Sequence, residues 1–594
     1  MDFIVLLAKV LAAICLLGLA GGFATLPFRE GRRFVLLLTP MFGLLILPLG
    51  VTLIYSSNRL SFQGSAIIAT FACAALTIFT FVYRRPTRDD VISTAILLPI
   101  VAAIATWMFC ASTIATGSPA LLYIDGSDHG GYAHAADWIL SHSISRQPIL
   151  AEDRPYESWP VVMFYSDFRY SAYVAISLMA ALTRTSGLFA FDPACAVAFT
   201  VGCLSVATVF ARSKFTLVAL SFCLLMAAWF ELGRDGYFGK LLAYPSSLFL
   251  VGLFATSYRT LTQSKLIIFC CLAVGNATMH AGVITAFFLA SAGSLIIVAD
   301  AAFTKPLIRE QVTHRFVALG AIALIALASG GMFARPLGVP GSPDGFYISW
   351  TSLFPHLFEI QNPTRDYFTI SDDWLRNGVL IGLGFHIGLY ALTLLQKNAV
   401  AASLAVAPLL IITMLIILDA LGATSARYAA YQFTGIVFTY ALCGLAWLFD
   451  SLDKKKSWKI AACLFLCVGL IGPRLPRVSG SLDTYVTHPP ASQIFKLTDF
   501  DTIAAAVGQQ PVLADIRDSI NAITLLVELG RRGMNIQWSK DGWNAVVGYR
   551  QWPLPNYSAA PKFILSDGAD QIDPQQMIFR GPQFKLRKIE SVSQ

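Results

Sequence analysis

The amino-acid sequence is built from long apolar runs that are separated by short polar segments. A helix of about 20 apolar residues is long enough to cross the hydrocarbon core of a bilayer. Lipid offers no partner for a free N–H or C=O group, so such runs must satisfy their own backbone as helices. Only 13% of the residues are charged, against about 25% in soluble domains. The chain is therefore predicted to be a polytopic α-helical membrane protein.

Fourteen apolar runs are predicted to be spans, and basic segments such as "REGRR" (29–33) and "DKKKSWK" (453–459) fall between alternate pairs of them. The positive-inside rule places these segments in the cytoplasm, so a retained first span begins outside. An apolar stretch at 170–183 is short, and counting it as a span would move every later basic segment outside. We expect an interfacial or re-entrant helix there. The expected spans are 2–26, 34–54, 64–83, 91–117, 188–211, 214–232, 242–258, 264–279, 281–299, 315–334, 377–396, 398–420, 430–449 and 458–472.

This topology divides the chain into four regions. They are an N-terminal four-span bundle (1–117), a first large external loop (118–187), the main transmembrane bundle (188–472) with an external loop at 335–376, and a soluble tail (473–594). In the tail, "PVLADI" and "KFILSD" are typical of short strands, and "NAITLLVELGRRG" of a helix that ends at Gly533. This order predicts a small C-terminal extracytoplasmic α/β domain. The expected location is the bacterial cytoplasmic (inner) membrane.

Charge and cysteine usage exclude other classes of protein. Much of the net charge of +8 lies in short loops between spans, so it does not indicate binding to nucleic acid, and membrane lipids are the expected surroundings. All eleven cysteines lie in apolar runs, so their spacing predicts neither a disulfide framework nor a zinc site.

Polar residues cluster directly after the fourth expected span, in "YIDGSDHGGYAHAADWI" (123–139). The stretch contains two acids, Asp125 and Asp128, and two histidines, His129 and His134. Cations lie near the outer ends of later spans at Arg234, Lys240, Arg376 and Arg427. A carboxylate that faces cations suits a reaction in which a hydroxyl loses a proton to a base. The cations would bind a phosphate group and stabilise it as it leaves.

The segment "SDHGGYAHAADWI" resembles the first external loop of the GT-C glycosyltransferases, which are multi-span enzymes that use polyprenyl-phosphate sugars. Asp128, Tyr132, Ala133 and Ala136 fit its pattern of an Asp, an aromatic residue and small residues at helical spacing. The resemblance implies a GT-C-like fold with Asp128 as catalytic base, a polyprenyl-phosphate sugar donor, a glycan or glycolipid acceptor and an inverting displacement. The spacing Asp125-Gly-Ser-Asp128 differs from the family's closer acidic pair, so Asp125 remains a rival base or a metal ligand.

Each candidate residue also has a purely structural interpretation. Asp128 can cap a helix that begins near Gly130, and the histidines can be hydrogen-bonded loop residues or, with the acids, ligands of a divalent cation. Arg427 can snorkel to the interface, and "GRDGYFGK" (233–240) can be a solvated turn. No cofactor is certain and no metal ligands are assigned. The candidates for binding substrate and lipid phosphate are Arg427, Arg234, Lys240, Tyr132, His129 and Arg376.

Two other functions remain open at this point. One is an envelope glycan polymerase or ligase, which also uses lipid-linked glycans, and the other is a lipid or glycan transporter. A transporter is expected to carry ionisable groups or broken helices near mid-membrane. The expected spans are nearly free of charge, with Lys9 as an exception, and this favours an enzyme with its active site at one membrane face.

Overall fold

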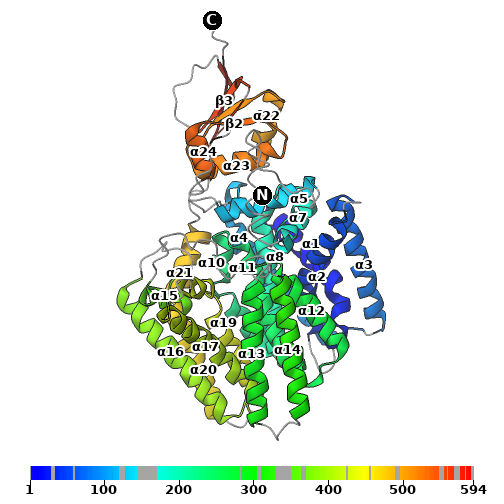
Figure 1. The fold of residues 1–594 in the computed structure, drawn as a ribbon, viewed down its shortest axis with the longest axis vertical. Coiled ribbons are helices and arrows are strands. Elements are labelled where there is room, and N and C mark those ends of the chain that lie inside the picture. The colour runs from blue at the N-terminus through cyan, green and yellow to red at the C-terminus, as the bar shows by residue number, and fades with distance from the viewer. Residues whose placement is uncertain are drawn as a thin grey trace.

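The structure is a large helical bundle with a small α/β domain at one end (Figure 1). It is a computed structural model. It describes residues 2–28, 34–57, 60–83, 85–119, 127–142, 170–280, 282–303, 309–329, 349–362, 370–422, 426–453, 457–488, 496–547, 554, 556–557, 559–567, 576–581 and 583–589.

Within these residues, eleven helices are long and apolar enough to cross a membrane, which confirms the prediction of a polytopic helical membrane protein. Each of them overlaps one of the expected spans. The last apolar segment runs from Ser457 to Thr487 through three short helical elements after α20, so it passes the expected boundary of the soluble tail at 473. The eleven helices are α1 (Phe3–Gly21), α2 (Thr39–Tyr55), α3 (Phe62–Tyr83), α4 (Arg88–Thr116), α8 (Gly187–Phe210), α11 (Phe238–Ser257), α13 (Gly282–Phe303), α14 (Arg309–Ser329), α16 (Asp372–Leu395), α17 (Ala399–Ala420) and α20 (Ser457–Ile471).

Three expected spans correspond to shorter helices, so the count of fourteen stays a prediction. They are α9 (Lys214–Leu224), α12 (Gln263–Ala277) and α19 (Val437–Ser451). After α9 the helix is interrupted at residues 225–228, and a new helix, α10 (Trp229–Arg234), begins. The expected span 214–232 is therefore a discontinuous helix. Helix α7 (Tyr170–Thr183) is the short apolar segment predicted at 170–183, and it is largely buried between α2, α5 (Ser127–Ser141) and α8.

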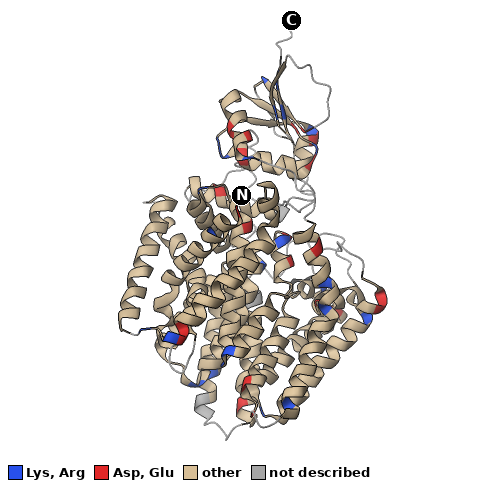
Figure 2. Cartoon of the chain, turned by 180° about the vertical axis from the view of Figure 1, so that it is seen from behind, with Lys and Arg blue, Asp and Glu red and all other residues tan. Residues whose placement is uncertain are grey.

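Basic segments that the sequence assigns to one side of the membrane do meet at one end of the bundle. The carboxylate of Asp450, at the end of α19, accepts hydrogen bonds from the backbone N–H groups of Arg212 and Ser213. Lys214 pairs with Asp89 at the start of α4, with 2.9 Å between the charged atoms. Figure 2 shows few charged residues along the middle of the bundle.

The C-terminal domain has its own apolar core and a five-stranded sheet in the order β2-β1-β3-β5-β4. Strand β1 pairs in parallel with β2 and with the central strand β3, so that Val512 lies opposite Ile536 and Phe563, whereas β5 is antiparallel to β3 and β4. The two predicted strands are confirmed as β1 and β3, and the predicted helix as α23, which ends at Gly530. The elements are α22 (Leu497–Val507), β1 (Val512–Asp515), α23 (Ser519–Gly530), β2 (Ile536–Trp538), α24 (Lys540–Val547), β3 (Phe563–Ser566), β4 (Met577–Arg580) and β5 (Lys585–Lys588).

Helix α5 lies between the bundle and the C-terminal domain, where α23 packs on it. A Cβ atom on Gly130 would lie 2.5 Å from Cγ2 of Ile523, so the two helices approach closely at this glycine. On the bundle side, the carboxylate of Asp137 accepts a 2.8 Å hydrogen bond from the N–H of Gly187 at the start of α8. Helix α5 is thus packed against both the bundle and the C-terminal domain.

Candidate functional site

Helix α5 carries the segment that resembles a glycosyltransferase loop, residues 127–139. The helix begins at Ser127, so Asp128 lies inside the first turn and not at the cap of a helix that begins near Gly130. The side chain of Asp128 and the whole of Asp125 lie outside the described residues. The structure therefore positions the backbone of Asp128, and its role as a base stays a prediction.

His129 follows directly and is buried in the bundle. Its ring stacks on Phe191 of α8, with 3.8 Å between the ring centroids. Burial and the positive charge of Arg234 lower the pKa of His129 to about 3, so the imidazole is neutral at physiological pH. Within the described part of the chain, neither ring nitrogen has a hydrogen-bond partner, and no three metal-ligating side chains gather into a group.

The loop "GRDGYFGK" packs directly on α5, although the two segments are about 100 residues apart in the sequence. The Tyr132 hydroxyl accepts a 3.1 Å hydrogen bond from the N–H of Gly239 at the start of α11. A side chain on Gly239 would meet this hydroxyl at 2.4 Å. Gly236 has φ of 87°, and a Cβ there would lie 2.9 Å from the backbone nitrogen of His129. Both glycines are needed for this contact because a Cβ at either position leaves no room, and at Gly236 the left-handed φ also disfavours other residues.

Two of the predicted cations belong to this loop, and both are buried. Arg234 donates a 2.8 Å hydrogen bond to the carbonyl of Phe109 and lies 3.6 Å from a carboxylate oxygen of Asp192. Its Nε and Nη2 have no hydrogen-bond partner among the described residues. Lys240 lies 4.4 Å from the ring centre of Tyr237 and 5.4 Å from that of Tyr431. The expectation of a solvated turn is wrong, because these side chains are packed inside the protein.

Arg427 lies in the short helix α18 (Ala426–Gln432), and Tyr431 of the same helix contacts Lys240. The side chain of Arg427 is 40% exposed and forms a 2.9 Å ion pair with Asp419. The Trp350 indole N–H also donates to Asp419, at 2.8 Å. Lys240 of the loop thus contacts α18, the helix that carries Arg427, although the two cations are far apart in the sequence.

Arg376 is the one predicted cation that the structure does not place with the others. Its side chain is 73% exposed at the start of α16, and the ion pair shown for it is with Asp373 on the same helix. Of the predicted residues with described side chains, His129 and Tyr132 contact the loop that carries Arg234 and Lys240, and Lys240 contacts α18, the helix that carries Arg427.

A buried ion network beside this site was not predicted. Arg477, in α21 (Leu475–Leu482), donates to a carboxylate oxygen of Glu231 at 2.6 Å and to the carbonyl of Met226 at 2.7 Å. Glu359 lies 3.8 Å from Arg477 and accepts a 3.0 Å hydrogen bond from the N–H of Ala228. Met226 and Ala228 belong to the break between α9 and α10, so the network satisfies backbone groups that the break leaves free.

Only part of this ion network could be recognised from the sequence. Glu231 and Arg234 are ionisable residues at the end of an apolar run, and such residues are candidates for function by default. Arg477 and Glu359 lie outside the expected spans, so their pairing with Glu231 could not be read from hydropathy. The expectation that the spans are nearly free of charge is wrong at this end of the bundle.

Next to the loop lies a small apolar cavity of about 90 Å³ between α1, α2, α7, α8 and α11. Its walls include Leu17, Leu47, Leu178, Val197 and Phe238. Phe238 directly precedes Gly239, so the cavity and the polar loop share a wall. The site therefore combines buried cations, a neutral histidine and an apolar recess.

Comparison with models of known protein families finds no match, and a search of curated proteins finds no similar sequence.

Proposed function

We propose that the chain is a GT-C-type glycosyltransferase that transfers a sugar from a polyprenyl-phosphate donor to a glycan or glycolipid acceptor. The observation that carries the proposal is the contact between α5 and the "GRDGYFGK" loop, made by Tyr132 on Gly239 and by His129 on Gly236. It puts the segment of the family resemblance beside buried cations. A base next to bound phosphate is what a displacement of lipid phosphate by a hydroxyl requires.

In the proposed reaction, Asp128 takes the proton of an acceptor hydroxyl. The resulting oxygen attacks the anomeric carbon of the sugar, and the bond from that carbon to the phosphate oxygen breaks. Lys240 and Arg427 hold the polyprenyl phosphate and stabilise its charge as it leaves. A single displacement inverts the anomeric configuration. Arg234 is assigned a positioning role, because its contacts with Phe109 and Asp192 hold it inside the bundle.

The apolar cavity beside Phe238 is proposed to receive part of the prenyl chain, and α7 forms one of its walls. The positive-inside rule supports an extracytoplasmic position for α5 and for the C-terminal domain, because the basic segments meet at the opposite end of the bundle. On this basis the proposed location is a bacterial inner membrane with the reaction on its outer side.

A transporter of lipids or glycans is the second candidate function. The discontinuous helix α9–α10 and the buried Glu231, Arg477 and Glu359 favour it, because transporters build their sites from broken helices and intramembrane charges. Against it, the charges of the network are already paired with one another and with the backbone of the break. A glycan polymerase or ligase would use the same site with a longer lipid-linked donor.

The experiment uses the purified full-length protein in lipid vesicles with a panel of polyprenyl-phosphate sugars, and it measures the released polyprenyl phosphate by mass spectrometry. Asp128→Asn is expected to lower the rate by about 10²–10⁴-fold, the usual contribution of a general base. Asp153→Asn removes a carboxylate of the same predicted loop and is the matched control, with an unchanged rate. Full activity in Asp128→Asn removes this residue from the role of base, and a loss confined to Asp125→Asn transfers the role to Asp125. Movement of an intact lipid-linked glycan across the vesicle membrane, without release of polyprenyl phosphate, identifies a transporter.

A further inference from the structure

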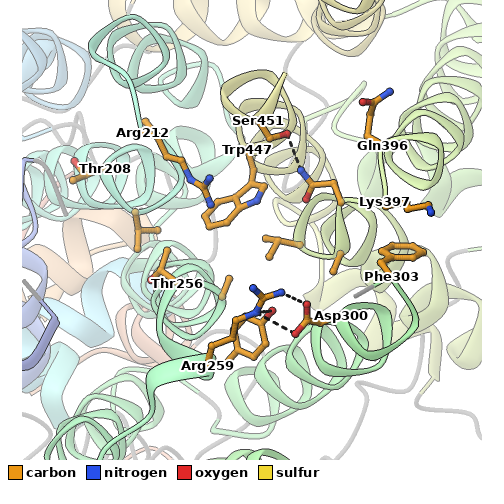
Figure 3. A pocket seen from close by; sticks show the side chains of 17 residues that line it. Thr208, Arg212, Thr256, Arg259, Asp300, Phe303, Gln396, Lys397, Trp447 and Ser451 are labelled. Atoms are coloured by element: carbon orange, nitrogen blue, oxygen red, sulfur yellow. Dashed lines mark hydrogen bonds and ion pairs between the residues drawn. The ribbon is translucent and has the colours of Figure 1, made fainter. Parts of the chain in front are cut away.

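A second, polar cavity lies at the end of the bundle opposite the C-terminal domain, and the proposed reaction does not use it. It has a volume of about 930 Å³ and is lined by the ends of α8, α11, α13 and α19 and by the turn between α16 and α17 (Figure 3). Among the described residues, three cationic side chains line it, from Arg212, Arg259 and Lys397, against one carboxylate, from Asp300. This part of the lining therefore carries a net charge of +2.

Arg212 is held in place by an aromatic ring and by its own backbone. Its guanidinium lies over the ring of Trp447, at 4.4 Å from the ring centroid. Its backbone N–H donates to Asp450, which fixes the base of the side chain. Within the described residues, no ion pair or side-chain hydrogen bond is shown for this guanidinium. An arginine that stacks on an aromatic ring keeps its N–H groups free for an anion in the plane of the guanidinium.

On another wall of the cavity lies Arg259, which shares its partner carboxylate, Asp300, with a second arginine. Arg259 pairs with Asp300 through two hydrogen bonds, and the Asp300 carboxylate is buried. Arg315 also lies 3.6 Å from this carboxylate. One buried acid thus faces two arginines, and the side chain of Arg259 is still 56% exposed. In Figure 3, Arg212 with Trp447 and Arg259 with Asp300 stand on different sides of the cavity.

We propose that this cavity binds a phosphate group, with Arg212 as its main ligand and Arg259 as the second. Guanidinium groups match the geometry of phosphate oxygens and bind them through paired hydrogen bonds. The cavity is far larger than one phosphate, and Val209, Val400 and Phe303 add apolar surface to its walls. Basic pockets between the ends of membrane helices accept the head groups of anionic lipids. The same chemistry accepts a soluble phosphate compound, so the test separates these two sources.

The test measures binding to the full-length protein in detergent by native mass spectrometry and by thermal-shift titration. Cardiolipin is the lipid probe with phosphatidylcholine as its zwitterionic reference, and inorganic pyrophosphate and ATP are the soluble probes. Arg212→Gln is expected to weaken the preferred probe at least about 10-fold, because hydrogen bonds to a charged group are lost. Lys214→Gln is the matched control, since Lys214 is an exposed cation of the same loop that does not line the cavity. We expect Lys214→Gln to bind as the natural protein does.

Selective loss of cardiolipin binding in Arg212→Gln identifies a lipid head group, and selective loss of pyrophosphate or ATP binding identifies a soluble compound. Equal binding of all probes by Arg212→Gln and the natural protein overturns the proposal. If Arg212→Gln unfolds at a markedly lower temperature, Arg259→Gln decides in its place, because Arg315 still neutralises Asp300 in that variant. Unchanged binding in a folded Arg259→Gln then overturns the proposal as well.

Discussion

Removal of the Arg477 guanidinium is the sharpest test of the buried ion network. Arg477 and Glu359 are fully buried, and the Glu231 side chain is 2% exposed. Arg477→Met keeps a side chain of similar length but leaves Glu231 without its ion-pair partner and Glu359 with only the positive charge of the nearby, buried Arg474. It also leaves the Met226 carbonyl without its hydrogen-bond donor. Because neither acid can reach water, we expect a large loss of stability.

The magnitude follows from the contacts. Each hydrogen bond to a charged group is worth about 1.5–3 kcal/mol, and Arg477 donates two of them, to Glu231 and to Met226. Breaking a buried ion pair by removing one partner costs about 3–5 kcal/mol in known cases. We therefore expect Arg477→Met to lower the free energy of unfolding by about 3–5 kcal/mol. Adding Glu231→Gln removes one stranded charge, so the double variant should recover part of the loss.

The assay is equilibrium unfolding of the purified protein in bicelles, followed by circular dichroism and by protease resistance of the bundle. Arg376→Met is the matched control, because Arg376 makes an exposed pair with Asp373. Exposed pairs of this kind are worth about 0–1 kcal/mol. A loss below about 1 kcal/mol in Arg477→Met, or equal losses in both variants, refutes the idea that this network holds the break between α9 and α10.

Two further predictions concern helix α5, on which the C-terminal domain packs. Gly130→Ala should loosen the domain by about 1–3 kcal/mol, because the new methyl group overlaps Ile523. Ile523→Ala in the same chain should restore docking, measured by protease cleavage between the two bodies. Burial and the charge of Glu528 raise the pKa of Asp137 to about 7, above its unfolded value of about 3.9. Ionisation of Asp137 thus opposes folding, so the free energy of unfolding should be highest near pH 4 and fall as the pH rises through 7. Asp137→Asn should remove this dependence, which thermal unfolding at a series of pH values checks.

The sequence predicted what depends on average hydropathy and on local pattern. The eleven long helices and the strands β1 and β3 follow from apolar runs of the right length. Hydropathy could not show the break at 225–228, because "LLMAA" is as apolar as the helices around it. The free backbone of that break is satisfied by Glu359 and Arg477, which come from distant segments.

For the candidate site, the sequence indicated several of the residues but not the contacts that bring them together. His129 and Tyr132, like Arg234 and Lys240, were recognisable as polar residues at the expected ends of spans. Their meeting through Gly236 and Gly239 depends on a close approach of two backbones, which leaves no periodic signal in the sequence. Arg376 has the same residue type as the other predicted cations and lies on the same predicted side, but it lies near the start of α16, where the side chains are exposed.

The ion network has a consequence for the site, because the two share α10. A helix of six residues gains little from its own hydrogen bonds, so it depends on contacts at both ends. Near its start, Glu231 is bound by Arg477, and just after its end, Asp235 accepts a 2.8 Å hydrogen bond from the Tyr485 hydroxyl. These contacts fix α10 and, directly after it, the glycines that meet α5. A side chain that never touches a substrate thereby sets the position of the loop against His129. Arg477→Met is therefore expected to disturb binding at α5 at temperatures where the bundle is still folded.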